Sequence, residues 1–135
     1  MVAPQTLILL PQSLAICRLA ATAAIPDWAI SQSLLSVTRT DEELSLVCDE
    51  AQVPESVVCD RPWQAFQVAG PLDFSLTGIL ASLLVPLAEA EISIFAVSTY
   101  NTDYLLVRQR QVKTAIAILG QRHRVILNSA EGAAE

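Results

Sequence analysis

The chain is poor in charge and in the residues from which most active sites are built. Of its 135 residues 16% are charged, against about 25% in an ordinary globular domain, and there is 1 histidine. The sequence shows no nucleophile with a recognisable base, no glycine-rich phosphate loop and no metal-ligand set. We therefore expect a protein that is not an enzyme and that binds no cofactor and no metal.

Cysteine is also scarce, and its spacing excludes the common metal motifs. Cys17, Cys48 and Cys59 show no C-x-x-C pair, and a zinc site would need more ligands at tighter spacing. Free cysteines usually behave as small hydrophobic residues in a core. We expect reduced, buried thiols, which are typical of a cytoplasmic protein.

The balance of charge and hydropathy excludes further classes of function. The net charge is −6, and the few basic residues are scattered over most of the chain, so nucleic-acid binding is disfavoured. Proline and charged residues interrupt the apolar stretches at 1–30 and 74–100, so we expect no signal peptide, no membrane span and a soluble protein. Because the mean hydropathy is nevertheless +0.46, the excess apolar surface indicates a homo-oligomer, most simply a dimer.

The first half of the chain contains a strand and a hairpin but no clear helix. An apolar run at 6–10 predicts a strand, and residues 34–38 and 44–48 predict the two arms of a hairpin around an acidic turn. Residues 13–24 fit either a helix or a second strand followed by a loop. Pro26 is typical of the first turn of a short helix.

The second half has a complete pattern of strands and helices. Its predicted elements are a strand at 63–68, a helix at 78–90 capped by Thr77, strands at 92–97 and 104–107, a helix around 112–119 and a strand at 124–127. The order βαββαβ is the ferredoxin-like plan, in which a four-stranded antiparallel sheet carries both helices on one face. His123, near the start of the last strand, is expected at the surface.

The predicted fold class is therefore α+β, with two ferredoxin-like βαββαβ units of which the first is degenerate. We expect the first unit at residues 1–62, the second at 63–128 and a flexible tail at 129–135.

A polar cluster separates two apolar strands in the second half. Residues 98–103 read Ser-Thr-Tyr-Asn-Thr-Asp and supply hydroxyls, an amide and a carboxylate within one turn. The Asp103 carboxylate either caps local amides, as Asp often does in turns, or pairs with the ammonium or cationic side chain of a ligand. At the helix start, Thr77 either caps the helix or, with Gly78, exposes free amides that suit a carboxylate.

Several segments resemble ACT domains of the type found in aspartokinases. The segments that carry the resemblance are Leu72-Asp-Phe74, Thr77-Gly-Ile-Leu80, Leu87-Ala-Glu-Ala-Glu-Ile-Ser-Ile-Phe95 and the polar turn, together with Thr40-Asp-Glu-Glu-Leu-Ser-Leu-Val-Cys48 in the first half. The combination is similar to small two-ACT bacterial proteins related to the ACT pairs of the cytosolic arginine sensors of animals. It covers about residues 5–127.

The resemblance implies a regulatory protein that binds an amino acid at an interface between two ACT units. The ligand-binding residues it implies are Leu76, Thr77, Gly78, Ile79 and Leu80 at the helix start and Ser98, Thr99, Tyr100, Asn101, Thr102 and Asp103 in the turn. No catalytic domain is attached, so any regulated target protein is unidentified. The alternative is an ACT-like dimerisation or protein-interaction module with a vestigial pocket.

Overall fold

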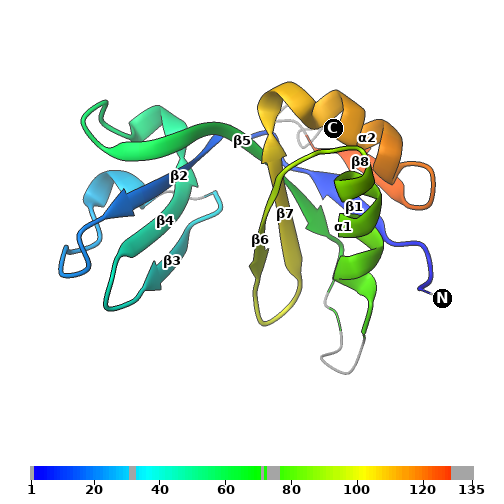
Figure 1. The fold of residues 1–135 in the computed structure, drawn as a ribbon, viewed down its shortest axis with the longest axis horizontal. Helices are drawn as coiled ribbons and strands as arrows, with labels where there is room; N and C mark the ends of the chain where they lie inside the picture. Colours follow the sequence, from blue (N-terminus) through cyan, green and yellow to red (C-terminus); the bar gives the residue numbers. More distant parts are fainter. Residues whose placement is uncertain (1, 31–32, 71, 73–76, 129–135) are drawn as a thin grey trace. The chain divides into compact units, whose positions relative to one another are not determined.

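The structure, a computed structural model, describes residues 2–30, 33–70, 72 and 77–128 and divides the chain into two compact units. The larger unit comprises Met1–Pro11 and Gln64–Glu135, and the smaller unit comprises Gln12–Trp63. Strand β5 (Val58–Val68) begins in the smaller unit and ends in the larger one (Figure 1).

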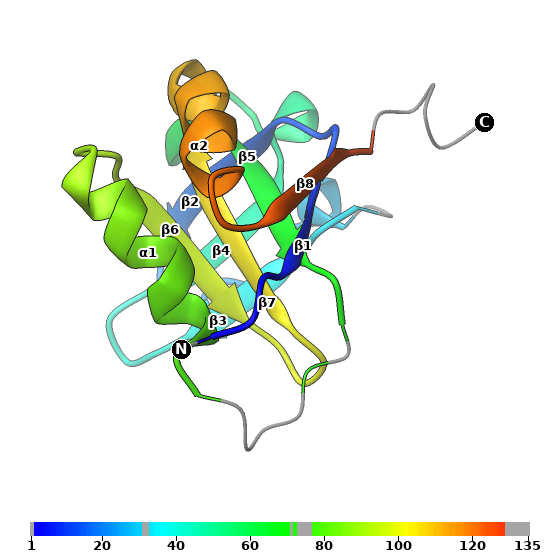
Figure 2. The ribbon, with the colours of Figure 1, turned by 90° about the vertical axis from the view of Figure 1, so that its right-hand side faces the viewer.

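The larger unit has the order of elements that the sequence predicts. After β5 come α1 (Ile79–Glu89), β6 (Ile94–Ser98), β7 (Asp103–Arg108), a 3₁₀ turn (Gln109–Gln111), α2 (Val112–Leu119) and β8 (Arg124–Leu127). Figure 2 shows both helices on the same face of the unit's sheet. The predicted ferredoxin-like α+β class is confirmed. Within the described ranges, no helix has the length and apolar character needed to cross a membrane.

An additional strand makes the sheet of the larger unit wider than the expected four strands. Strand β1 (Thr6–Leu9) lies between β5 and β8, which gives the order β6-β7-β5-β1-β8. Leu7 pairs antiparallel with Val68 of β5 and parallel with Val125 of β8. In a four-stranded unit the last strand, here β8, lies beside β5. Strand β1 runs in the same direction as β8 and takes that place, so β8 becomes the edge strand.

The position of β1 differs from the expected division of the chain, which placed residues 1–62 in one unit. Leu7 and Leu9 are buried in the core of the larger unit, so the first eleven residues belong with the second half. Sequence neighbours usually pair in space, but β1 pairs with β5 and β8 and not with β2, the next strand along the chain.

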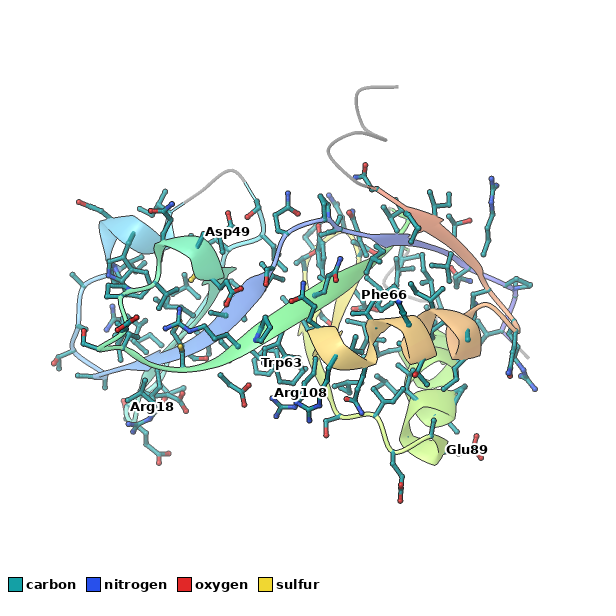
Figure 3. All side chains as sticks on the ribbon, turned by 90° about the horizontal axis from the view of Figure 1, so that it is seen from above. Arg18, Asp49, Trp63, Phe66, Glu89 and Arg108 are labelled. Atoms are coloured by element: carbon teal, nitrogen blue, oxygen red, sulfur yellow. The ribbon has the colours of Figure 1, made fainter. Side chains whose placement is uncertain are left out.

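Regular spacing of apolar side chains builds the core of the larger unit. Ile79, Leu83 and Leu87 repeat every four residues along α1 and are all buried. The sheet and α2 meet them with Leu7, Leu9, Phe66, Val68, Leu105, Val107, Val112, Ala115 and Leu119. Burying one Leu or Phe contributes about 1.5–3 kcal/mol, so this shared core fixes both helices against the sheet. Figure 3 labels Phe66 on β5 and Glu89 at the end of α1.

The smaller unit is a degenerate copy of the same plan. Its elements are β2 (Leu14–Leu19), a 3₁₀ turn (Asp27–Ala29), β3 (Ser36–Arg39), β4 (Leu44–Asp49), a second 3₁₀ turn (Glu50–Gln52) and the first half of β5. The strand order β3-β4-β2-β5 is that of a ferredoxin-like sheet, but 3₁₀ turns of three residues replace the helices in the described residues. The predicted hairpin is confirmed by the antiparallel pairing of β3 and β4. Residues 14–19 are a strand, which decides between the two readings of 13–24.

His123 is buried, so its expected surface position is wrong. Its side chain is 8% exposed, and the backbone N–H of Gln5 donates a hydrogen bond to its Nδ1 over 2.9 Å. Since Nδ1 accepts, a neutral ring carries its proton on Nε2. Among the described residues Nε2 is buried without a hydrogen-bond partner. The ring joins the segment before β1 to the segment before β8, a contact that the neighbouring arginines in the sequence do not indicate.

Replacing His123 by alanine should destabilise the protein by about 1–3 kcal/mol, because the Gln5 N–H would lose its acceptor in a part-buried position. His123→Asn, which keeps an oxygen acceptor close to the position of Nδ1, should lose less. The free energy of unfolding in urea measures both. Arg122→Ala, at an exposed neighbour, should change it by less than about 0.5 kcal/mol. Equal losses for the alanine and asparagine variants would show that ring packing, not the hydrogen bond, stabilises this position.

Candidate functional site

Helix α1 begins after Gly78, whose backbone only glycine adopts easily. Gly78 is the N-cap with φ of 79°, and no side chain among the described residues caps the helix. An L-residue with a side chain loses about 1–2 kcal/mol in this left-handed conformation. The predicted capping by Thr77 is therefore wrong, because Gly78 and not Thr77 stands at the N-cap.

The uncapped helix start leaves amide donors available. Ser82 N–H is bonded to the Gly78 carbonyl over 3.0 Å, as the first full turn requires. The amides of Ile79, Leu80 and Ala81 lie in the first turn of α1, where the helix has no carbonyl that can accept a hydrogen bond from them. They also lie at the positive end of the helix dipole, which favours a negatively charged group.

The polar turn is a compact hairpin between β6 and β7. Ser98 and Asp103 are the last pair of the two strands, and Ser98 Oγ donates to Asp103 Oδ1 over 2.6 Å. Thr99 N–H donates to the Thr102 carbonyl over 2.8 Å. The tip, Tyr100 and Asn101, faces solvent, with Tyr100 80% exposed. The Asp103 carboxylate thus has one oxygen engaged by Ser98, which leaves further acceptor capacity on a charged group.

Buried contacts fix this hairpin to the end of β5. Thr102 is 5% exposed, and its Oγ1 donates to the Val68 carbonyl over 2.6 Å. Leu72 N–H donates to the Asn101 carbonyl over 2.7 Å. A Cβ on Gly70 would lie 3.1 Å from that same carbonyl oxygen, so glycine permits the close approach. The hairpin is therefore a rigid feature.

The helix start and the hairpin enclose a pocket of about 340 Å³. Its lining residues are Leu72, Gly78, Ile79, Leu80, Ser98, Thr99, Tyr100, Asn101, Thr102 and Asp103. The structure thus brings together the predicted site residues except two. Leu76 lies outside the described residues, and Thr77 does not line the pocket.

One lining residue was missed from the sequence. Leu72 supplies an apolar wall and is tied to the hairpin tip through its amide. A signal was present in the sequence, because the pair Gly70-Pro71 predicts a turn directly before Leu72.

A larger hollow of about 730 Å³ lies along the other side of α1. It is lined by Val85 and Glu89 of the helix, by residues 118–123 in part and by the N-terminal segment, and it shares Gly78 with the smaller pocket. Ligand sites usually combine an apolar wall with a few convergent polar groups. The smaller pocket has that combination: hydroxyls of the hairpin, the Asp103 carboxylate and the amides of a helix start.

This arrangement suits a small molecule that carries one negatively and one positively charged group. The amides at the start of α1 can bind a carboxylate, and Asp103 can bind an ammonium group through a charge-assisted hydrogen bond. Ser98, Thr99 and Asn101 can add neutral hydrogen bonds from the hairpin. The volume matches the lower end of the range for ligand pockets, about 300–1,000 Å³.

Comparison with known proteins agrees with this architecture. Residues 58–121 match the sequence profile of the ACT domain. The chain contains an ACT domain over these residues. Residues 12–56 match a second profile, described as an N-terminal domain, so the two matches follow the two structural units closely.

Relatives with known names or structures extend the likeness. The cytosolic arginine sensor for mTORC1 subunit 1 of Homo sapiens is 33% identical over 97 residues, which cover 64% of this chain and 30% of the human protein. Protein Atu0741 from Agrobacterium tumefaciens is 39% identical, with a TM-score of 0.88 over 94% of this chain and 96% of the other. Aspartate kinase from Clostridium acetobutylicum, at 10% identity, shares the fold alone, with a TM-score of 0.57 over 82% of this chain and 32% of the kinase.

Gly78→Ala should destabilise the protein by about 1–2 kcal/mol, since alanine is strained at this φ. Its Cβ would also lie 3.1 Å from Val2 Cγ2. Thr77→Ala should change the free energy of unfolding by less than about 0.5 kcal/mol, because the exposed threonine caps nothing. Urea unfolding of both variants measures these changes. If Thr77→Ala lowers the free energy of unfolding by about 1 kcal/mol, Thr77 caps the helix after all.

Proposed function

We propose that the chain is a non-catalytic regulatory protein that binds a free amino acid in the pocket between the start of α1 and the β6–β7 hairpin. The observation that carries the proposal is that Asp103 and the first residues of α1 line one pocket. An α-amino acid carries its carboxylate and its ammonium group on the same carbon atom, so one small ligand can pair with the helix amides and with Asp103 at the same time.

Two further observations support an amino acid over other small molecules. The pocket holds one carboxylate among its described lining residues and no basic side chain, which disfavours phosphorylated ligands. The related human protein is named as an arginine sensor, and an arginine-like ligand would offer a second cation to the same carboxylate-bearing turn. Each neutral hydrogen bond is worth about 1 kcal/mol net, so we expect a dissociation constant in the micromolar range.

We propose further that the ligand lies at an interface between two ACT units and that the protein is a homodimer. The exposed tip at Tyr100 supports this, because a pocket whose outer wall is solvent-exposed gains affinity when a second surface closes it. Ligand binding would then tighten the dimer. Through such a change of assembly, ligand binding would be transmitted to a target protein in the cytoplasm.

The second candidate function is an ACT-like interaction module whose pocket binds nothing. The exposed apolar side chains of Val85 on α1 and Leu127 on β8 favour it, since such surfaces often mark protein contacts. Ligand binding distinguishes the two candidates directly.

A thermal-shift screen of the twenty amino acids should find at least one that raises the melting temperature by several degrees. At about a hundredfold excess over the dissociation constant the ligand adds ~2.7 kcal/mol to stability. Asp103→Asn should abolish the shift, because it removes the charge but keeps an oxygen that accepts from Ser98 Oγ.

The matched control is Glu89→Gln, an exposed carboxylate on α1 outside this pocket, and it should respond to the ligand like the unmodified protein. A full ligand response in Asp103→Asn would remove the proposed role of the carboxylate. No response to any amino acid, by melting temperature or by sedimentation, would favour the interaction module.

A further inference from the structure

The three cysteines, scattered in sequence, lie side by side in the smaller unit. Cys48 is on β4, Cys17 on β2 and Cys59 on β5, and these strands are consecutive neighbours in the sheet. Cys17 and Cys59 are directly opposed partners across the β2–β5 ladder. Cys48 is two residues beyond Leu46, the β4 partner of Cys17, so it points to the same face as Cys17.

The strand pairing brings the three side chains together on one face of the sheet, and all three cysteines are free thiols. Cys17 and Cys48 are 2% and 1% exposed, whereas Cys59 is only partly buried against the same apolar cluster. The row of sulfur atoms therefore has one end that solvent reaches and one that it does not.

The backbone favours one particular pair. Directly opposed residues of an antiparallel ladder have Cα atoms about 4.5–5.5 Å apart, within the range of about 4.4–6.8 Å that a disulfide requires. Diagonal neighbours such as Cys17 and Cys48 are about 7–8 Å apart. Cys17 and Cys59 can thus be joined without moving the strands.

We propose that Cys17 and Cys59 are a peroxide-sensitive pair that forms a reversible disulfide across β2 and β5. In the first step the Cys59 thiolate attacks hydrogen peroxide, its sulfur becomes a sulfenic acid, and the O–O bond breaks with release of water after protonation. In the second step Cys17 sulfur attacks the sulfenic sulfur. The S–S bond forms, the S–O bond breaks, and the hydroxyl leaves as water with the Cys17 proton. Two thiols are oxidised and one peroxide is reduced.

The pKa values of the thiols affect the rate of oxidation, whereas the strand register determines which two cysteines pair. Burial raises the pKa of the Cys59 thiol, and the Arg61 guanidinium opposes that effect. Because the thiolate is the nucleophile, oxidation should be slow near neutral pH and should accelerate as the pH rises. The pKa of Cys17 is also raised, foremost by its interaction with the Cys48 thiol, so the proton that Cys17 loses as its sulfur attacks is available for the leaving hydroxyl.

The experiment treats the full chain with hydrogen peroxide and follows its mass and thiol content. The intact mass should fall by two hydrogen atoms, the free thiols should drop from three to one, and non-reducing peptide mapping should join Cys17 to Cys59. A dithiol should reverse the change. Because the cross-link restricts the unfolded chain, the oxidised form should melt at a higher temperature. The rate of the mass loss should increase between neutral and alkaline pH.

Cys48→Ser is the matched control and should still lose two hydrogen atoms. Cys59→Ser should keep both remaining thiols free, with its fold checked by circular dichroism. If a serine variant fails to fold, peptide mapping of the oxidised chain without substitutions still identifies which cysteines are joined. A Cys17–Cys48 bond, or oxidation that stops at sulfinic acid on Cys59, would overturn the proposal, as would three thiols that persist under peroxide concentrations that oxidise a free-cysteine peptide.

Discussion

The hydrogen bond from the buried Thr102 hydroxyl to the Val68 carbonyl is the constraint on which the pocket depends. Val68 is fully buried in the core of the larger unit, so its carbonyl is fixed by packing. Through Thr102 that rigidity is passed to the hairpin, and Asp103 follows at the next position. The start of α1 is held by Ile79 and Leu83, which are buried in the same core cluster as Val68. Both walls of the pocket are therefore fixed to one core, which sets the separation of Asp103 from the helix start.

Most of the local structure could be predicted because short-range patterns determine it. The two apolar runs at 92–97 and 104–107, with a polar turn between them, predict a hairpin, and β6 and β7 pair as predicted. The spacing of Val112, Ala115 and Leu119 likewise specifies the buried face of α2. The residues around the pocket were predictable for the same reason: a helix start and a hairpin turn are both local features. Their approach to each other follows from the ferredoxin-like plan, which the order of elements identifies.

What the sequence did not reveal depends on distant parts of the chain or on backbone conformation. The insertion of β1 between β5 and β8 is decided by Leu7 and Leu9 packing against residues more than fifty positions away. His123 accepts from Gln5, 118 positions away, and its charged neighbours suggest exposure. At the helix start, threonine offers a capping oxygen that glycine lacks, and this favoured Thr77 as the N-cap. The positive φ of the N-cap position reverses that preference, and φ cannot be read from residue types alone.

The loss of helices from the smaller unit restricts how an ACT–ACT site can be built from this chain. The proposed clamp needs consecutive unpaired amides at the positive end of a helix dipole. In the smaller unit the described residues between strands form only 3₁₀ turns of three residues, which have almost no dipole and no row of free amides. The smaller unit thus cannot supply the carboxylate-binding half of a second equivalent site. Under the proposed function, the surface that closes the pocket should come from the larger unit of another copy. The smaller unit, which keeps the sheet and has lost the helices, retains a row of three thiols as its own distinctive chemistry.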